Sequence, residues 1–414
     1  MTPAVARTDS VTPLARAALY LTWACAATTL VSIAVYQILL ALAFATILLS
    51  GIRPRLPRIW LPLALFMAGT VASLLLSGDM AAGRPQIRKF YVYLMLLAVY
   101  SAFRTLVQVR RLVLTWTIVG GAAAVLGIVQ FAGKMGDTRP PGVGFYQYYV
   151  ASRITGFTSN WQTYSGEMMI VLLLVLAFLM FSPKVRGRWL WVCLASAAAV
   201  GMAVLLGYTR GTWLATGASV LYLVWFWKRR LLAALPLVAL LVLWVNPGGV
   251  RTRFQSAFEP RKDTDSNQHR IVCWRTGWEM IKAHPWFGVG PERVGPLFTE
   301  YVPKDIPRPL PDGWYGHLHN FYIHYAAERG VATMLLLVAA LVMILYDCLR
   351  ALRKLPAGRG ELKAVLHGAV AVVLGIMISG LFEVNVGDSE VLALLLAVVA
   401  CGYAALNSTE AAHA

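Results

Sequence analysis

Three of the seven histidines fall within eight residues, at His317, His319 and His324. A histidine whose pKa is about 6.5 is largely neutral at neutral pH and can take a proton from a hydroxyl group. His319, which is followed by Asn320, is therefore a candidate general base. A zinc site is the competing interpretation, but on a helix these positions form no i, i+4 pair and share no carboxylate. We predict no metal and no other cofactor.

Several arginines lie beside long apolar stretches of the chain. Arg210, in Tyr208-Thr209-Arg210-Gly211, separates two apolar blocks with almost no loop on either side. An ionisable side chain at a membrane boundary is energetically costly and indicates a functional site, unless it merely extends to the lipid headgroups. Guanidinium groups pair bidentately with phosphate oxygens and stay charged at physiological pH. A group of them would suit a lipid-linked diphosphate; each taken alone also fits a solvated loop. The further members are Arg88, Arg153 and Arg270.

The elements that must position these residues are membrane-spanning helices. The chain of 414 residues is 58% hydrophobic and only 14% charged, whereas a soluble domain carries about a quarter charged residues. The apolar residues fall in blocks of about 16 to 21, the length that crosses a bilayer as helix. We predict an all-α polytopic membrane protein with about twelve transmembrane helices, the tenth entering the membrane near Gly330, at residues 16–32, 34–51, 59–77, 90–104, 112–132, 164–182, 189–208, 211–227, 231–246, 321–348, 363–383 and 389–406.

The charges alternate between successive connections. One set of connections and the N-terminal stretch carry 19 basic residues against four acidic ones. The positive-inside rule makes that face cytoplasmic, so both termini are predicted to be cytoplasmic. Most of the net charge of +18 is then a topology signal, and we predict no nucleic-acid partner. The basic residues are Arg7, Arg16, Arg53, Arg55, Arg58, Arg104, Arg110, Arg111, Lys184, Arg186, Arg188, Lys228, Arg229, Arg230, Arg350, Arg353, Lys354, Arg359 and Lys363.

The connection between the ninth and tenth spans, about 247–320, is far longer than an ordinary loop and is expected to be functional or separately folded. Within it, Arg270 to Ala283 has apolar residues at helical spacing and stops before His284-Pro285. We expect this helix to lie on the membrane surface, where Trp274 would suit the interface. The predicted organisation is spans one to nine at 1–246, an extracytoplasmic loop at 247–320, spans ten to twelve at 321–406 and a cytoplasmic tail at 407–414.

The histidine stretch resembles bacterial O-antigen ligases. Their pattern is a histidine followed by Asn, Ser or Gln, nine further residues, then Gly-x-x and Gly, Thr or Tyr; here it reads His319-Asn320, nine residues, Gly330-x-x-Thr333. These ligases belong to a superfamily with Wzy polymerases and protein O-oligosaccharyltransferases. Other stretches similar to that superfamily are Arg153-x-x-Gly156 followed by Asn160, Tyr208-Thr209-Arg210-Gly211, Arg270 with Trp274, His284-Pro285-x-Phe287-Gly288-x-Gly290 and Phe382-Glu383-x-Asn385-x-Gly387-Asp388-Ser389-Glu390.

The resemblance implies a GT-C-like glycosyltransferase of lipopolysaccharide biosynthesis in the bacterial inner membrane. It would move O-antigen from undecaprenyl diphosphate to lipid A-core on the periplasmic face, with inversion and without a metal. His319 would be the base, and Arg210 and Arg270 would hold the diphosphate and stabilise its growing charge. The further candidates for substrate binding are Arg153, Asn320, His317, Arg88 and Trp274.

Other functions remain open at this point. An O-antigen polymerase or a protein O-oligosaccharyltransferase would use the same donor and the same chemistry. A multi-span transporter would suit the span count and the intramembrane Glu167, although the chain shows no inverted repeat and no paired interrupted spans. Asp263-Thr-Asp265 could chelate a divalent ion as in nucleotide-sugar transferases, but a solvated turn is the commoner form of such a polar stretch.

Overall fold

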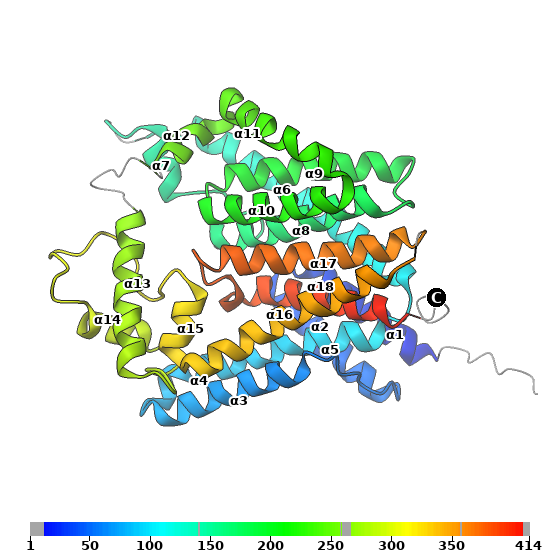
Figure 1. The fold of residues 1–414 in the computed structure, drawn as a ribbon, viewed down its shortest axis with the longest axis horizontal. Helices are drawn as coiled ribbons and strands as arrows, with labels where there is room; N and C mark the ends of the chain where they lie inside the picture. The colour runs from blue at the N-terminus through cyan, green and yellow to red at the C-terminus, as the bar shows by residue number, and fades with distance from the viewer. Residues whose placement is uncertain (1–11, 140, 257, 259–265, 357, 409–414) are drawn as a thin grey trace, which may run out of the picture.

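The computed structural model describes residues 12–139, 141–256, 258, 266–356 and 358–408. All the regular secondary structure in these residues is helical, as predicted. The long helices run side by side in one direction, and a group of short helices covers one end of the bundle (Figure 1). The helices that run along the bundle are α1 (Pro13–Thr28), α2 (Ile33–Leu49), α3 (Trp60–Leu76), α5 (Leu94–Ala102), α6 (Leu106–Gly136), α8 (Trp161–Phe181), α9 (Arg188–Leu206), α10 (Arg210–Lys228), α11 (Ala234–Val245), α16 (Val331–Lys354), α17 (Gly360–Ser379) and α18 (Ser389–Leu406).

Six of the described helices are long and apolar enough to cross a membrane, or up to seven if one bent pair is counted as a span. They are α6, α8, α9, α16, α17 and α18. Helices α2 and α3 are as apolar but shorter. The described part of the chain therefore has the make-up of a polytopic membrane protein.

The centre of the bundle is formed by α8, α17 and α18, whose apolar windows are the most buried of the six. Small residues allow α17 to approach its neighbours closely, as is typical of membrane helices. A Cβ added at Gly368 would meet Leu174 of α8 at 3.1 Å. One added at Gly375 would lie 3.1 Å from Leu173 of α8 and 3.3 Å from Ser219 of α10. Helix α17 is thus packed closely against α8 and α10, and the loop that follows it, residues 380–388, lies at the end of the bundle.

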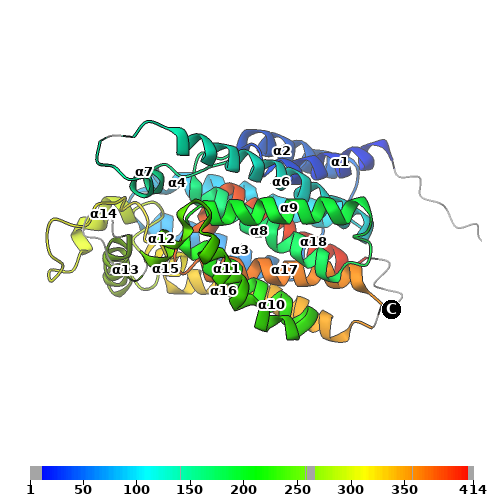
Figure 2. The same cartoon turned by 90° about the horizontal axis from the view of Figure 1, so that it is seen from above.

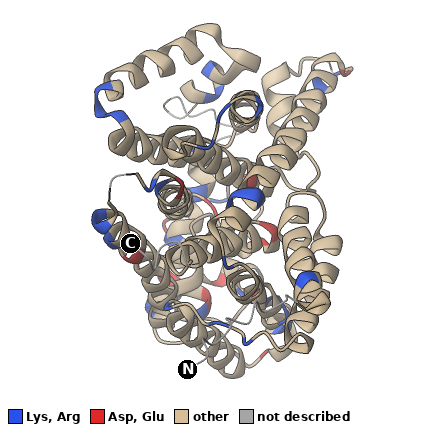
Figure 3. Ribbon diagram, turned by 90° about the vertical axis from the view of Figure 1, so that its right-hand side faces the viewer, with Lys and Arg blue, Asp and Glu red and all other residues tan. Residues whose placement is uncertain are grey.

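Figure 3 looks onto the end of the bundle at which α1 begins and α18 ends, and basic residues lie in several of the connections seen in this view. Ion pairs link connections that are distant in sequence. Arg58 contacts Asp347 at 2.7 Å, and Glu361 contacts Arg110 at 3.0 Å and Lys184 at 3.4 Å. Four of the five connections predicted to share a face therefore lie together.

The opposite end carries the short helices α4 (Met80–Arg88), α7 (Phe145–Ala151), α12 (Val250–Gln255), α14 (Val294–Tyr301) and α15 (Phe321–Arg329), together with the longer α13 (Ser266–Ala283). The helix predicted at Arg270–Ala283 is present as α13 and begins four residues earlier. It runs across the bundle end, roughly perpendicular to the long helices, and is seen nearly end-on in Figure 2.

The tenth predicted block, 321–348, is not one helix. It is divided at Gly330 into α15 and α16, and the long apolar helix begins at Val331, in agreement with an entry near Gly330. Gly330 has a φ of 85°, and a Cβ there would lie 1.9 Å from the carbonyl oxygen of Trp286. The segment 284–290 packs against this break: the amide of Val331 donates to the carbonyl of Pro285 at 2.9 Å.

Candidate functional site

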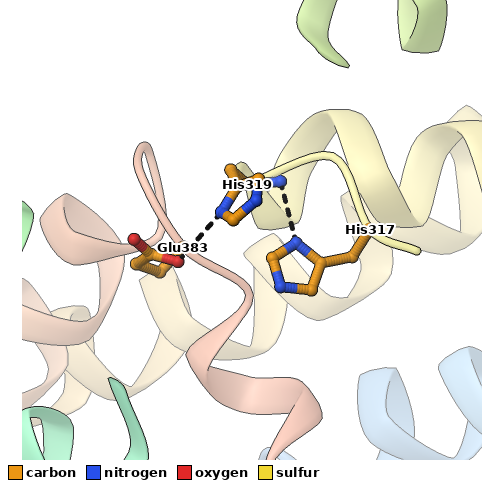
Figure 4. A group of neighbouring side chains, drawn as sticks. All are labelled: His317, His319 and Glu383. Atoms are coloured by element: carbon orange, nitrogen blue, oxygen red, sulfur yellow. Dashed lines mark hydrogen bonds and ion pairs between the residues drawn. The ribbon is translucent and has the colours of Figure 1, made fainter. Parts of the chain in front are cut away.

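His319 and Glu383 form the centre of the site. His319 lies in the loop before α15, and its Nδ1 is 3.3 Å from Oε2 of Glu383 in the loop after α17 (Figure 4). Burial raises the pKa of the Glu383 carboxyl, but the charge of Arg270 and the hydrogen bond from His319 outweigh it and lower that pKa to about 2. An ionised carboxylate at this position favours a proton on Nδ1 of His319. We therefore assign the free lone pair of the ring to Nε2, which suits a general base.

Glu383 is held by two further groups. Nη2 of Arg270 donates to its Oε1 at 2.6 Å, and the side-chain amide of Gln162, at the start of α8, donates to its Oε2. The Glu383 side chain is only 4% exposed. A buried carboxylate that is both paired and hydrogen-bonded keeps its partners in place. Glu383 therefore links the loop before α15, which carries His319, to α13, which carries Arg270.

The backbone around His319 is set by hydrogen bonds. Asn320 caps α15 by accepting from the amide of Ile323 at 3.0 Å, and its Nδ2 donates to the carbonyl of Leu381 at 3.1 Å. The amide of Phe321 donates to the carbonyl of Gly380 at 2.8 Å. His319 itself has a φ of 49°, a left-handed conformation that is uncommon for a residue other than glycine. Asn320 thus orients the base by fixing the loop that carries it.

His317 supports His319 and is neutral at physiological pH. The amide of His319 donates to Nδ1 of His317 at 3.1 Å, and the two ring centroids are 4.1 Å apart (Figure 4). Burial, helped by the nearby His319, lowers the pKa of His317 to about 3. The ring of His269 on α13 lies 5.1 Å from that of His319, and burial lowers its pKa to about 4. Both neighbours therefore remain uncharged beside the base.

His317, His319 and Glu383 together form a group that could hold a metal ion. One potential ligand atom from each lies within 4.8 Å of the others. The sequence argument against zinc assumed that the histidines lie on a helix. That assumption is wrong, because residues 316–320 precede α15 and are not helical. However, the guanidinium of Arg270 already lies 2.6 Å from Glu383, and a cation beside this carboxylate opposes a second one. Asp263 and Asp265 lie outside the described residues.

Arg210, Arg270 and Trp274 come together across a groove of about 310 Å³. The α13 face at Asn267, Arg270, Ile271 and Trp274 follows the i, i+3, i+4, i+7 spacing of a single helix face. It lies opposite the start of α10, where Nη2 of Arg210 donates to Oδ1 of Asn267 at 2.7 Å. The remaining lining residues are Gly211, Leu214 and Phe382.

Two hydrogen-bond donors of the groove residues are unused. Nε of Arg270 and Nε1 of Trp274 are buried and have no partner among the described residues. Leaving a buried donor unpaired is energetically unfavourable, so such donors point to a ligand acceptor. Arg210 is the first residue of α10, where the helix N-terminus adds positive potential. The arrangement is suited to an anion with several acceptor oxygens.

Arg153 lies close to this cluster. Its guanidinium is 5.2 Å from the ring centroid of Trp161, and its Nε donates to the carbonyl of Val150 at 3.1 Å. Burial and the charge of Arg253 lower the pKa of Arg153 to about 9, while Glu383 opposes that shift. It therefore stays protonated at neutral pH. Arg153 is not among the residues that line the groove, and its charge acts on the site from a neighbouring position.

Arg88 lies at the C-terminal end of α4, next to Lys89. It is exposed at the end of α4 and has no hydrogen bond or ion pair within the described part of the chain. Its neighbour Lys89 instead reaches the loop after α17, where Nζ donates to the carbonyl of Gly387 at 3.2 Å. The basic character of a residue does not determine the direction in which its side chain points, so the sequence alone does not distinguish Arg88 from Lys89.

Glu383, Gln162 and Asn267 were not among the predicted site residues. A signal existed for Glu383, which stands in a polar stretch between the last two apolar blocks and within one of the stretches similar to the superfamily. Gln162 and Asn267 carry no such signal, since a single amide in a polar segment is usually solvated. Their roles follow only from the contacts with Glu383 and Arg210.

Comparison with known proteins gives one match. Residues 195–338 match the family model described as O-Antigen ligase, a segment that includes Arg210, Arg270 and His319. The resemblance found in the sequence is thereby confirmed, and it implies a glycosyltransferase acting on polysaccharide and lipid-linked substrates. No curated protein matches the chain. Glu383 and Arg153 lie outside the matched segment.

Proposed function

We propose that this chain is an O-antigen ligase, which transfers O-antigen polysaccharide from undecaprenyl diphosphate to a sugar hydroxyl of lipid A-core. The observation that carries the proposal is the bridge made by Glu383. One carboxylate oxygen contacts the base candidate His319 and the other contacts the cation Arg270, at 3.3 and 2.6 Å. Glu383 thus holds a proton acceptor and an anion-binding group close to each other.

His319 acts on the acceptor. Its Nε2 takes the proton of the acceptor hydroxyl while that oxygen attacks the anomeric carbon of the donor sugar. Glu383 holds the proton on Nδ1 and stabilises the imidazolium that forms, as the buried carboxylate does in other histidine-based catalysts. Attack opposite the leaving diphosphate inverts the configuration at the anomeric carbon.

Arg210 and Arg270 act on the leaving group. The bond from the anomeric carbon to the phosphate oxygen breaks, and negative charge grows on the diphosphate. Fixed guanidinium groups stabilise that charge without the reorganisation that water would require. The unused donors Nε of Arg270 and Nε1 of Trp274 supply further hydrogen bonds. Arg153 adds positive charge, and no metal is needed for the step.

The apolar part of the groove suits the lipid. Leu214, Ile271 and Phe382 line it beside the two arginines. A polyprenyl chain entering from the bilayer would pass these side chains while its diphosphate reaches the guanidinium groups. The lipid A-core acceptor would then approach from the side of His317 and His319.

The charge distribution supports a specific placement in the membrane. We propose twelve spans, with the basic end in the cytoplasm together with both termini and the site on the periplasmic face of the inner membrane. The segment 247–320 would then be periplasmic, and α13 would lie at the membrane surface, as its direction across the bundle end suggests.

The test uses a bacterial strain that makes O-antigen but lacks its own ligase. Expression of this chain should restore banded, O-antigen-capped lipopolysaccharide on a gel, and His319→Ala should abolish the bands. His367→Ala is the control, because His367 on α17 lies outside the site and contacts Tyr222 at 2.9 Å. Immunoblots check membrane insertion of each variant. Normal bands from His319→Ala would overturn the mechanism, and longer polymer without capping would assign polymerase activity instead.

A further inference from the structure

The chain makes a sharp bend after α11 that the proposed chemistry does not yet use. The segments Arg210–Val245 and Pro247–Gln255 meet at 93°. Asn246, Gly248 and Gly249 have φ values of 52°, 62° and 85°, which two glycines in succession allow. The bend brings α12 back to the connection between α9 and α10, which contains Tyr208.

Close packing holds the bend against that connection. A Cβ on Gly249 would lie 2.9 Å from the hydroxyl of Tyr208, and one on Gly248 would lie 2.8 Å from Leu206. The hydroxyl of Tyr208 donates to the carbonyl of Gly248. Neither glycine position therefore has room for a side chain without a shift of these neighbours.

Arg253 also contacts the connection between α9 and α10. Its Nε donates to the backbone carbonyl of Tyr208 at 2.9 Å, and its Nη1 donates to the hydroxyl of Tyr146 at 3.2 Å. Arg253 is only 5% exposed, although arginine is rarely buried without such partners. Tyr208 is fully buried and has a φ of 50°, a conformation that persists in such a residue only when the surroundings hold it.

The position of Arg210 depends on this turn. Tyr208 is two residues before Arg210, and Thr209, which lies between them, is extended and contacts Ser165 at 3.1 Å. Arg210 is the first residue of α10, so the backbone direction at Tyr208 and Thr209 sets where its side chain starts. A rotation of the Tyr208 peptide would move the guanidinium away from Asn267 and the groove.

We propose that Arg253 is a positioning residue for the lipid-diphosphate site: through the carbonyl of Tyr208 it fixes the turn that presents Arg210 to the donor. The bend at 246–249 is then a part of the binding machinery, since it brings Arg253 to that turn. This inference rests on the proposed function, because it concerns the same anion site.

The test measures binding of undecaprenyl diphosphate to the full-length purified protein. Arg253→Gln should weaken binding about tenfold, as expected for loss of a charge-assisted contact that orders a ligand group. Arg251→Gln is the matched control on the same helix, because Arg251 is exposed, and it should bind normally. Equal affinities for Arg253→Gln and Arg251→Gln would overturn the inference.

A double variant separates positioning from direct contact. If Arg253 acts through Arg210, adding Arg253→Gln to Arg210→Gln should cause no further loss of affinity. Additive losses would mean that Arg253 touches the ligand itself, and the positioning role would be rejected. If the native chain fails to bind undecaprenyl diphosphate, the proposed function falls first and this inference falls with it.

A second substitution covers the case in which Arg253→Gln does not fold. Gly249→Ala leaves Arg253 in place but directs a methyl group at the hydroxyl of Tyr208. It should weaken binding by a similar factor while the protein still inserts and melts cooperatively. Normal affinity in this variant would show that the bend does not control Arg210.

Discussion

Glu383 stands 64 residues after His319, and its Oε2 lies 3.3 Å from Nδ1 of that ring. The two residues come from the loops that precede α15 and follow α17. A hydrogen bond between the backbones of Phe321 and Gly380 joins the same two loops. Glu383 thus orients the base from the loop after α17, and its carboxylate is nearly inaccessible to water.

Replacing Glu383 by glutamine should remove the charge while keeping the shape. We expect transfer to fall by about 10²- to 10⁴-fold, because an amide does not stabilise the imidazolium and can select the wrong tautomer of His319. Quantified lipopolysaccharide bands, or turnover of purified protein with a lipid-linked donor, would show the loss. Glu279→Gln is the control, since the side chain of Glu279 on α13 is 40% exposed and pairs with Lys282. Full activity of Glu383→Gln would exclude the carboxylate from the mechanism.

The stability of the fold should depend on pH through the same carboxyl group. Its pKa is lowered from 4.5 to about 2, so its contribution is fully present above about pH 4.5 and is lost as pH falls towards 2. The contribution is on the order of 3 kcal/mol for a group this buried. Melting temperatures in detergent at several pH values would measure it as the difference between the native chain and Glu383→Gln. A constant difference from pH 6 to pH 3 would contradict the assignment.

Arg210, Arg270 and Trp274 could be predicted as site residues from the sequence, because the residues around them in the chain make them stand out. Arg210 and Arg270 are charged residues at the ends of apolar or amphipathic segments, where a charge is costly and therefore conspicuous. Trp274 follows Arg270 by one helical turn, so the helix expected at 270–283 already placed both on one face. The helix that carries Arg270 and Trp274 could therefore be predicted from the local sequence alone.

Other parts could not be read because they depend on contacts between distant segments. The histidines were interpreted on a helix, but Asn320 caps α15 and leaves His317 and His319 in the preceding loop. The pairing of Glu383 with His319 requires the packing of α17 on α8, which no local pattern encodes. Arg88 was included for its charge, yet α4 directs Lys89 rather than Arg88 to the loop after α17.

Removing Arg270 should harm both stability and activity. Arg270→Ala leaves Glu383 buried without its ion partner, which should cost about 3 kcal/mol of unfolding free energy and abolish transfer. In the double variant Arg270→Ala, Glu383→Gln, stability should largely return while activity does not. Arg275→Ala is the control, because its ion pair with Asp305 is exposed and should contribute little. Thermal melts and band intensities would together separate the two effects.

The three ligand-capable groups at the base predict a response to added metal. Chelation by EDTA should leave transfer unchanged, because the arginines supply the positive charge at the leaving group. Zinc ions at sufficient concentration should inhibit, because coordination by His317, His319 and Glu383 would compete with Arg270 for the carboxylate and disturb the base. Turnover assays with EDTA and then with micromolar zinc would measure both. Loss of activity with EDTA that zinc or magnesium restores would show that the cluster holds a required metal.

Gly330 should be intolerant of any side chain, since the break between α15 and α16 determines where the histidine loop lies. Gly330→Ala would place a methyl group 1.9 Å from the carbonyl oxygen of Trp286, at a φ of 85° that disfavours alanine. The segment 284–290 would have to move, and with it the hydrogen bonds from Val289 and Gly290 to the end of α15. We expect a loss of at least about 3 kcal/mol in unfolding free energy and no capped lipopolysaccharide. Gly133→Ala in α6 meets no atom within 4 Å and should melt like the native chain, or slightly higher. If the two variants behaved alike, α15 would not depend on this break, and the position of His319 would have to be explained by Asn320 and Gly380 alone.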